Sequence, residues 1–148
     1  VYKRQARARA EDIIKNLKSE VNRISNGHGG VKKHSVFVQI GSRPLFAATK
    51  EHLLNDLVGF AGGVNIASDA GAGFYSRERV YSRNPDVIII VEMGVPGERE
   101  KKVWESGRKL NAAKNKRIYI VDSYKFCSPT PVTFLEALKE LAGYLEFQ

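Results

Sequence analysis

The sequence predicts an α/β fold, with a Rossmann-like, mainly parallel sheet flanked by helices and preceded by one long helix. Three observations predict it. Strand-like and helix-like segments alternate along most of the chain. Residues 87–91 are all Val or Ile, which is typical of a strand covered on both faces of a parallel sheet. The first 24 residues carry an apolar stripe at helical spacing.

The stripe predicts a helix of roughly 20 residues, which would be roughly 30 Å long. Its members recur every three or four positions, and they are Ala6, Ala10, Ile13, Ile14, Leu17, Val21 and Ile24. The glycine-rich run 26–30 is predicted to end the helix, because glycine tolerates a left-handed turn.

The next elements alternate in type. Residues 35–40 read as a strand, and a helix is predicted over about residues 50–61, where Gly62-Gly63 stops it. A short strand is predicted at residues 64–67. Ser76 is placed to cap a short helix that Pro85 prevents from continuing.

The second half repeats this order. The strand 87–91 is followed by a predicted helix near residues 98–107, which carries Val103 and Trp104, and then by a strand at 117–121. Thr130-Pro131 is a typical helix start and predicts a final helix. Its apolar side is formed by Phe134, Leu135, Leu138, Leu141, Ala142 and Leu145.

Composition and charge limit the classes of function. The chain has 148 residues, which suits one domain with a core, and one cysteine, Cys127, which excludes an internal disulfide. The net charge of +8 raises the alternative of a basic nucleic-acid module. Residues 1–33 hold nine Lys or Arg against three Asp or Glu, so the excess lies on the first helix, and a solvated helix face explains it more simply.

Motifs for common chemistries are missing. The sequence contains no phosphate-binding loop and no GxSxG elbow, and its histidines and cysteine lack metal-ligand spacing. The segment Gly71-Ala72-Gly73 is a weak dinucleotide signal. A small flavodoxin-like nucleotide-binding or enzymatic domain stays open as an alternative, but the sequence favours a binding protein over an enzyme. No metal ligands and no cofactor are predicted.

Ligands of parallel α/β sheets bind beyond the carboxyl ends of the strands. In this chain those ends are predicted at residues 41–46, 68–75, 92–95 and 122–128.

Four blocks, in this order, carry a resemblance to a known family. They are "VFVQIGSRPLFAATKEHLLNDLVGFAGGVNIA", "YSRERVYSRNPDVIII", "LNAAKNKRIYIVD" and "SPTPVTFLEALKELAGYL". Together they resemble the C-terminal lobe of the class III, or cluster A, substrate-binding proteins of ABC importers, which capture siderophores, haem and cobalamin. The resemblance covers nearly the whole chain.

The resemblance implies two α/β lobes joined by one long helix, of which this chain would hold the helix and the second lobe. Residues 1–33 would be the interlobe backbone helix and its exit loop, and residues 34–148 the C-terminal ligand-binding lobe. The opening Val1-Tyr2-Lys3-Arg4-Gln5 looks like a translated adapter remnant. We therefore expect residues 1–5 to be non-native and an upstream part to be missing.

The resemblance also assigns a role to Glu78. In these proteins each lobe presents a glutamate that docks on arginines of the membrane permease, and Glu78 lies at that position of the Ser-x-Glu motif that starts at Ser76. A docking carboxylate must be exposed and fixed on a rigid element. The alternative is that Glu78 only complements the positive end of a helix dipole. Arg77 and Arg79 could also pair with it.

The ligand contacts that the resemblance implies lie in three segments at the carboxyl ends of the strands. They are Arg43, Pro44, Leu45 and Phe46, then Phe74 and Tyr75, then Tyr124, Lys125, Phe126 and Ser128. Phe46 is the candidate for contact with a flat ligand, with core packing as its alternative. Arg43 and Lys125 would be cleft cations suited to carboxylates, with solvation at the surface as the alternative for Lys125.

The implied function is that of the solute-binding component of an ABC importer. The ligand would be a small-molecule metal chelate, either an iron complex (siderophore or haem) or a corrinoid. The partners would be the permease subunits, with no nucleic acid. The protein would act outside the cytoplasm, in the periplasm or lipid-anchored at the outer face of the cell membrane.

Overall fold

The computed structural model describes residues 1–27, 32–93 and 96–146, and it confirms the predicted α/β class. Five strands form one sheet: β1 (His34–Ser42), β2 (Leu45–Ala47), β3 (Gly63–Asn65), β4 (Val87–Glu92) and β5 (Ile118–Asp122). Seven helices lie in the described part of the chain: α1 (Tyr2–Asn26), α2 (Leu53–Phe60), α3 (Arg77–Arg83), α4 (Gly97–Glu105), α5 (Asn111–Lys114), α6 (Ser123–Cys127) and α7 (Pro131–Leu145).

The sheet is mainly parallel, as predicted. Strand β1 pairs in parallel with β3 near its start and with β4 along its length, and β4 pairs in parallel with β5. Strand β2 is antiparallel and pairs with the end of β1. The chain thus goes from β1 to β3 on one side of β1 and then to β4 on the other side of β1. This reversal places a topological switch point between the carboxyl ends of β1 and β4.

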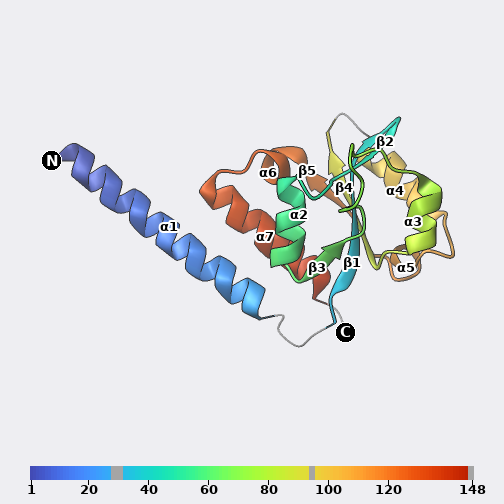
Figure 1. Cartoon of the computed structure of the whole chain (residues 1–148), viewed down its shortest axis with the longest axis horizontal. Helices are drawn as coiled ribbons and strands as arrows, with labels where there is room; N and C mark the ends of the chain where they lie inside the picture. Colours follow the sequence, from blue (N-terminus) through green and yellow to red (C-terminus); the bar gives the residue numbers. More distant parts are fainter. Residues whose placement is uncertain (28–31, 94–95, 147–148) are drawn as a thin grey trace.

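Helices cover both faces of the sheet (Figure 1). Val36, Val38, Ile89 and other side chains of one face pack against α2, α6, α7 and the end of α1. Phe37 and its neighbours on the other face pack against α3, α4 and α5. Successive strand residues point to opposite faces, so the continuous Val/Ile run of β4 is buried on both sides, at 0–1% exposure.

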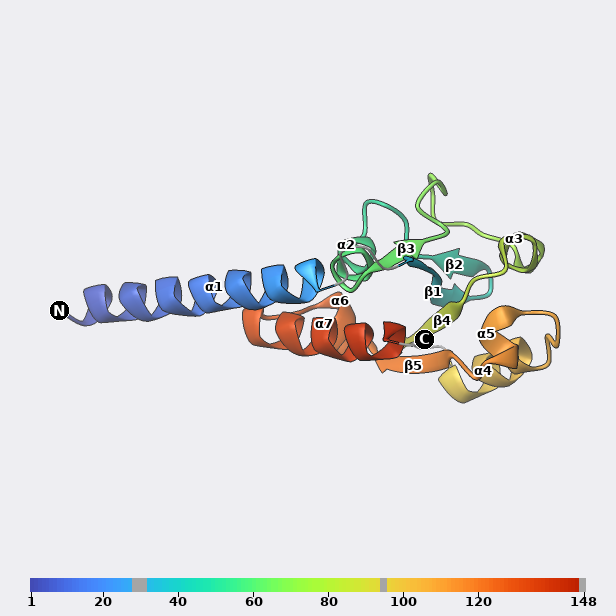
Figure 2. The ribbon, with the colours of Figure 1, turned by 90° about the horizontal axis from the view of Figure 1, so that it is seen from below.

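Helix α1 is longer than the predicted helix and mostly uncovered. Figure 2 shows it running past α7 and continuing away from the rest of the chain. Of the predicted apolar stripe, Ile24 is buried, whereas Ile13 and Ile14 are 50% and 45% exposed. None of the described helices is long and apolar enough to cross a membrane.

Three details of the elements differ from the expectation. Gly27 caps α1 in the right-handed region, with φ of −62°, and the rest of the predicted glycine-rich stop extends beyond residue 27, outside the described residues. Gly62 has φ of +88°, a conformation that favours glycine, but Gly63 opens β3 rather than ending a helix. The strand predicted at 64–67 therefore begins one residue earlier and ends at Asn65.

Candidate functional site

The candidate site lies along the carboxyl end of the sheet. This end carries β2 at one edge, α6 at the other and the start of α4 between them. Figure 1 shows β2 and α6 at the end of the sheet opposite the C-terminus. Every segment that the sequence predicted for ligand contact follows a strand at this end. The structure divides their side chains into an exposed group and a buried group.

Phe46 and Phe74 form an aromatic pair in this region. Their ring centroids are 4.5 Å apart, and Phe74 is 59% exposed. Residues 46 and 74 also form an isolated antiparallel bridge. Gly73 has φ of +80°, and a Cβ there would lie 2.9 Å from the Phe46 ring. A side chain at position 73 would therefore displace the ring, so glycine allows the two aromatic residues to meet.

Three predicted contact residues lie in the core instead. Leu45 and Tyr75 are each 8% exposed, and Phe126 is 1% exposed. Phe126 packs against α2 and α7 in one core cluster, and Leu45 and Tyr75 belong to the cluster on the other face. These side chains support the site from beneath, which differs from the expectation that they form its surface.

Lys125 also differs from its predicted role as a cleft cation. Its Nζ donates to Glu140 Oε2 of α7 at 2.8 Å. This hydrogen bond, together with the charges of nearby carboxylates, raises the pKa of Lys125 against an opposing effect of desolvation. The charge of Lys125 is therefore used within the fold, between α6 and α7.

The other predicted residues are accessible. Arg43 and Pro44 are exposed in the turn between β1 and β2, and Tyr124 is 75% exposed on α6, with Ser128 exposed just after it. Tyr124 and Ser128 follow β5, at the opposite edge of the sheet from the Phe46–Phe74 pair. The structure thus brings Phe46 and Phe74 together but leaves Tyr124 and Ser128 apart from them.

Helix α3 presents Glu78 in its first turn. Ser76 is the N-cap, as predicted, and its hydroxyl accepts from the Arg79 backbone N–H at 3.2 Å. Asn84 ends the helix in the left-handed conformation, directly before Pro85. Glu78 is exposed and forms no ion pair or side-chain hydrogen bond with any described residue.

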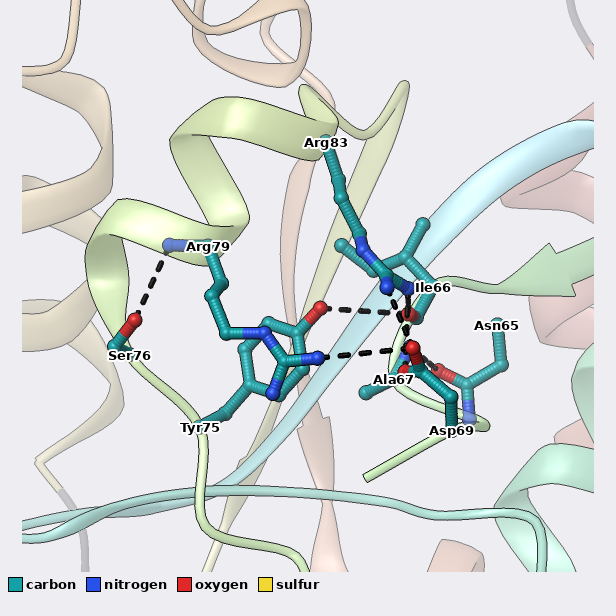
Figure 3. A network of polar contacts seen from close by, with 8 residues as sticks. All are labelled: Asn65, Ile66, Ala67, Asp69, Tyr75, Ser76, Arg79 and Arg83. Carbon is teal, nitrogen blue, oxygen red and sulfur yellow. Dashed lines mark hydrogen bonds and ion pairs between the residues drawn. The ribbon is translucent and has the colours of Figure 1, made fainter.

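The arginines beside Glu78 are turned to other partners. Arg79 lies over the Tyr75 ring at 4.5 Å and reaches Asp69 at 3.6 Å (Figure 3). Arg77 Nη2 donates to Glu100 Oε2 at 2.8 Å, and its guanidinium lies 4.5 Å from the Trp104 ring centroid. Neither arginine therefore neutralises Glu78, contrary to the pairing that the sequence left open.

The loop before α3 is hydrogen-bonded to the last residue of α3, Arg83. Arg83 donates to both carboxylate oxygens of Asp69 and to the Ile66 carbonyl, and the Tyr75 hydroxyl donates to that carbonyl at 3.4 Å (Figure 3). The hydrogen bond from Arg83 outweighs the effect of partial desolvation and lowers the pKa of Asp69. These contacts fix α3 on the body of the fold.

A buried polar network, which sequence reasoning missed, lies beneath the switch point. Gln39 is fully buried in β1, and its Oε1 accepts from Trp104 Nε1 at 2.7 Å. Its Nε2 donates to Glu100 Oε2 at 2.9 Å and to the Gly41 carbonyl at 3.2 Å. Glu100 connects this network to Arg77. The sequence signal for this network is Gln39, a single amide side chain inside an otherwise apolar strand. A buried amide needs hydrogen-bonding partners.

Burial and hydrogen bonding act in opposite directions on Glu100. Burial alone raises its pKa, but hydrogen bonds from Gln39 and Arg77 and the charges of Arg77 and Arg43 lower it by more. Glu100 therefore has a pKa below its ordinary value and is held as a carboxylate. Within the described part of the chain, no three His, Cys, Asp or Glu side chains form a group that could hold a metal ion.

Comparisons with known proteins agree on one family. A family model described as "Periplasmic binding protein" matches residues 2–125. The vitamin B12-binding protein of Yersinia pseudotuberculosis is 30% identical over 83 residues, which cover 55% of this chain and 30% of that protein.

Two solved structures match most of this chain. A possible iron-binding (periplasmic solute-binding) protein of Staphylococcus epidermidis is 29% identical, with a TM-score of 0.79, over 93% of this chain and 55% of that one. An ABC transporter substrate-binding protein of Listeria monocytogenes is 28% identical, with a TM-score of 0.75, over 93% of this chain and 57% of that one. The chain thus spans little more than half the length of these solved relatives.

Proposed function

Because the chain belongs to the periplasmic binding protein family, we propose that it is the solute-binding component of an ABC importer. Its cargo is an iron complex, with siderophore or haem as the chelator, or a corrinoid. The protein works outside the cytoplasm and delivers this cargo to the permease. Relatives whose names refer to vitamin B12, to iron and to an ABC transporter support this proposal.

The observation that carries the proposal is the placement of the half-buried Phe46, the exposed Phe74 and the exposed Arg43 along one end of the sheet. Phe46 and Phe74, whose rings are tilted by 48° to each other, offer an apolar surface, and Arg43 offers an exposed positive charge on the same hairpin as Phe46. Small-molecule sites combine apolar walls with a few oriented polar groups in this way. In this proposal residues 34–148 form one wall of the site, and residues 1–33 are the interlobe helix and its exit loop, which join this lobe to a second one.

A spectral titration tests the function. Haem, ferric siderophores and cobalamin all absorb visible light, so each is titrated into the 148-residue chain and into a chain extended by a first lobe. We expect one class of chelate to bind the extended chain saturably and the 148-residue chain more weakly, because one lobe supplies only part of the walls. If no class of chelate bound either protein, the proposal would be wrong. Equal affinity of the two proteins would contradict the two-walled site.

We also propose that Glu78 docks on arginines of the permease. Its exposure, its rigid cap and its lack of partners among the described residues support this role. Charge-assisted hydrogen bonds contribute about 1.5–3 kcal/mol each, so Glu78→Ala is expected to weaken binding to importer-containing membrane vesicles by at least about tenfold. Glu105→Ala, which removes another exposed glutamate, is the matched control. Equal binding of the two variants would exclude docking through Glu78.

A further inference from the structure

Positive charge gathers in one short segment, residues 106–117. This segment holds five Lys or Arg and no Asp or Glu, whereas the rest of residues 34–148 holds ten Lys or Arg against thirteen Asp or Glu. The small net excess of residues 34–148 therefore conceals a basic segment within an acidic remainder. Such a separation of charge creates a field that attracts polyanions to one side of a domain.

The fold holds this segment in place and leaves its charges outside. Leu110 and Ala112 are fully buried and anchor α5 in the core cluster of its sheet face. The backbone N–H of Asn111 donates to Asn84 Oδ1 at the end of α3, at 2.8 Å. Lys116, with φ of +55°, turns the chain after α5 before it enters β5. The basic segment is therefore a fixed surface.

Four bases of this segment are exposed and form no ion pair with any described residue. We call them the α5 basic surface, and they are Arg108, Lys109, Lys114 and Lys116. By contrast, the arginines of α3 all have carboxylate partners, and so does Lys125 of α6. The exposed side of α4 carries both signs, for example at Lys102 and Glu105. The uncompensated charge of this face is thus concentrated around α5.

The α5 basic surface belongs to the same face of the sheet as Glu78. Helices α3, α4 and α5 pack on this face, whereas α1 and α7 pack on the other. Figure 2 shows α3, α4 and α5 grouped at the end of the molecule away from the N-terminus. The seven residues of α3, which separate Glu78 from the contact with α5, rise only about 10 Å. A lobe that docks on a membrane protein through Glu78 therefore brings this basic surface near the bilayer.

We propose that the α5 basic surface binds the anionic headgroups of the membrane that holds the permease. Lipid phosphates accept charge-assisted hydrogen bonds from Lys and Arg, and clusters of about four or more such residues are typical of proteins that bind anionic membranes. This inference rests on the proposed docking through Glu78, because that docking selects a bilayer among the polyanions that a basic surface attracts. Lipid and permease contacts made by one lobe act together, so even a weak lipid contact raises the affinity of docking.

Co-sedimentation with vesicles tests the lipid contact without a permease or a chelate. We expect the 148-residue chain to bind vesicles made of equal parts phosphatidylglycerol and phosphatidylcholine, but not vesicles of phosphatidylcholine alone. Added salt should release the chain, because it screens the attraction between exposed charges. Equal binding to both kinds of vesicle, or binding to neither, would overturn the proposal.

Two matched variants locate the contact. The α5 variant is Arg108→Gln/Lys109→Gln/Lys114→Gln/Lys116→Gln. The α1 variant removes the same net charge from exposed positions that form no ion pair with any described residue, and it is Lys3→Gln/Arg4→Gln/Arg9→Gln/Lys18→Gln. We expect the α5 variant to bind the anionic vesicles at least about tenfold more weakly and the α1 variant to bind them as the unmodified chain does. An equal loss in both variants would show that net charge alone decides, and it would overturn the proposal.

A charge-retaining variant separates loss of charge from damage to the fold. It exchanges Arg for Lys and Lys for Arg at the four positions of the α5 basic surface. It should bind the anionic vesicles as the unmodified chain does, because every positive charge is kept. A loss as large as that of the α5 variant would contradict an electrostatic contact with lipid.

Two further measurements separate the lipid contact from its alternatives. Duplex DNA is titrated at the same salt concentration, and tighter binding of DNA than of the anionic vesicles would assign the surface to a nucleic acid instead. Importer-containing vesicles with the same lipids then compare the chain with the α5 variant, which should dock more weakly. Undiminished docking of the α5 variant, with no binding to lipid vesicles, overturns the lipid contact and leaves the proposed function standing. Lipid binding through the α5 basic surface, with no docking on the importer, supports the lipid contact but contradicts the proposed function.

Discussion

Replacing Trp104 with alanine is expected to lower the free energy of unfolding by about 3–5 kcal/mol. Trp104 is fully buried, and its ring packs edge-on against Phe37 at a centroid distance of 5.9 Å. The substitution leaves a large cavity and also removes the N–H that Gln39 Oε1 accepts. Domains are stable by only about 5–15 kcal/mol, so this loss is a large fraction of the total.

Urea unfolding measures this effect. Trp104 is the only tryptophan of the chain, so far-UV circular dichroism replaces fluorescence as the probe. Val103→Ala is the matched control, because Val103 is the preceding residue of α4 and is 40% exposed, and it should change stability by less than about 1 kcal/mol. Trp104→Phe separates the effect of packing from that of hydrogen bonding. Its loss of stability should fall between the losses of Trp104→Ala and Val103→Ala. A change below 1 kcal/mol for Trp104→Ala would contradict the packing described for this face.

The second large effect is expected for Glu100→Ala, with a loss of about 2–4 kcal/mol at pH 7. The substitution leaves an Arg77 donor and a Gln39 donor without their shared acceptor. Removing one partner of a buried ion pair can cost more, but the Arg77 side chain is 32% exposed and water can reach part of it. Glu100→Gln retains an acceptor and the shape of the side chain, so it should lose less stability than Glu100→Ala.

The pH dependence distinguishes charge from shape. The pKa of Glu100 is lower in the folded chain than its ordinary value of 4.5, so its carboxylate stabilises the fold above that value. This contribution is lost as the pH falls below 4.5 and through the lower folded pKa. The difference between the unmodified chain and Glu100→Gln should therefore be largest at neutral pH and should narrow in acid.

Urea unfolding at a series of pH values from 7 down to the acid range measures this difference. Glu105→Gln, on the exposed side of α4, is the control and should differ from the unmodified chain by about 0.5 kcal/mol or less at every pH. A difference between the chain and Glu100→Gln that stayed constant with pH would show that the charge of Glu100 has no role in stability.

Much of the fold follows from local patterns in the sequence. The Val/Ile run of β4 and the alternating pattern of β1 predict buried parallel strands, and the starts of α3 and α7 follow from Ser76 and Thr130-Pro131. The missed elements are β2, α5 and α6, which have three, four and five residues. Such segments are too short to show a period of 2 or 3.6, so tertiary packing decides their conformation.

The candidate site was less predictable than the fold, because most of its contacts join distant segments. Gln39 and Glu100 are 61 residues apart in the sequence. Lys125 donates to Glu140 on the next helix, so its charge is paired within the fold. The exposure of Glu78 agrees with its expected position in a capped first turn.

Glu100 belongs to two parts of the molecule at once. Its Oε2 accepts from Gln39 of β1, and the same atom accepts from Arg77, the residue before Glu78. A ligand that shifts the end of β1 would therefore act on the group that holds the first turn of α3. By thermodynamic reciprocity, a partner contact that moves Arg77 would then change the affinity of that ligand by the same factor.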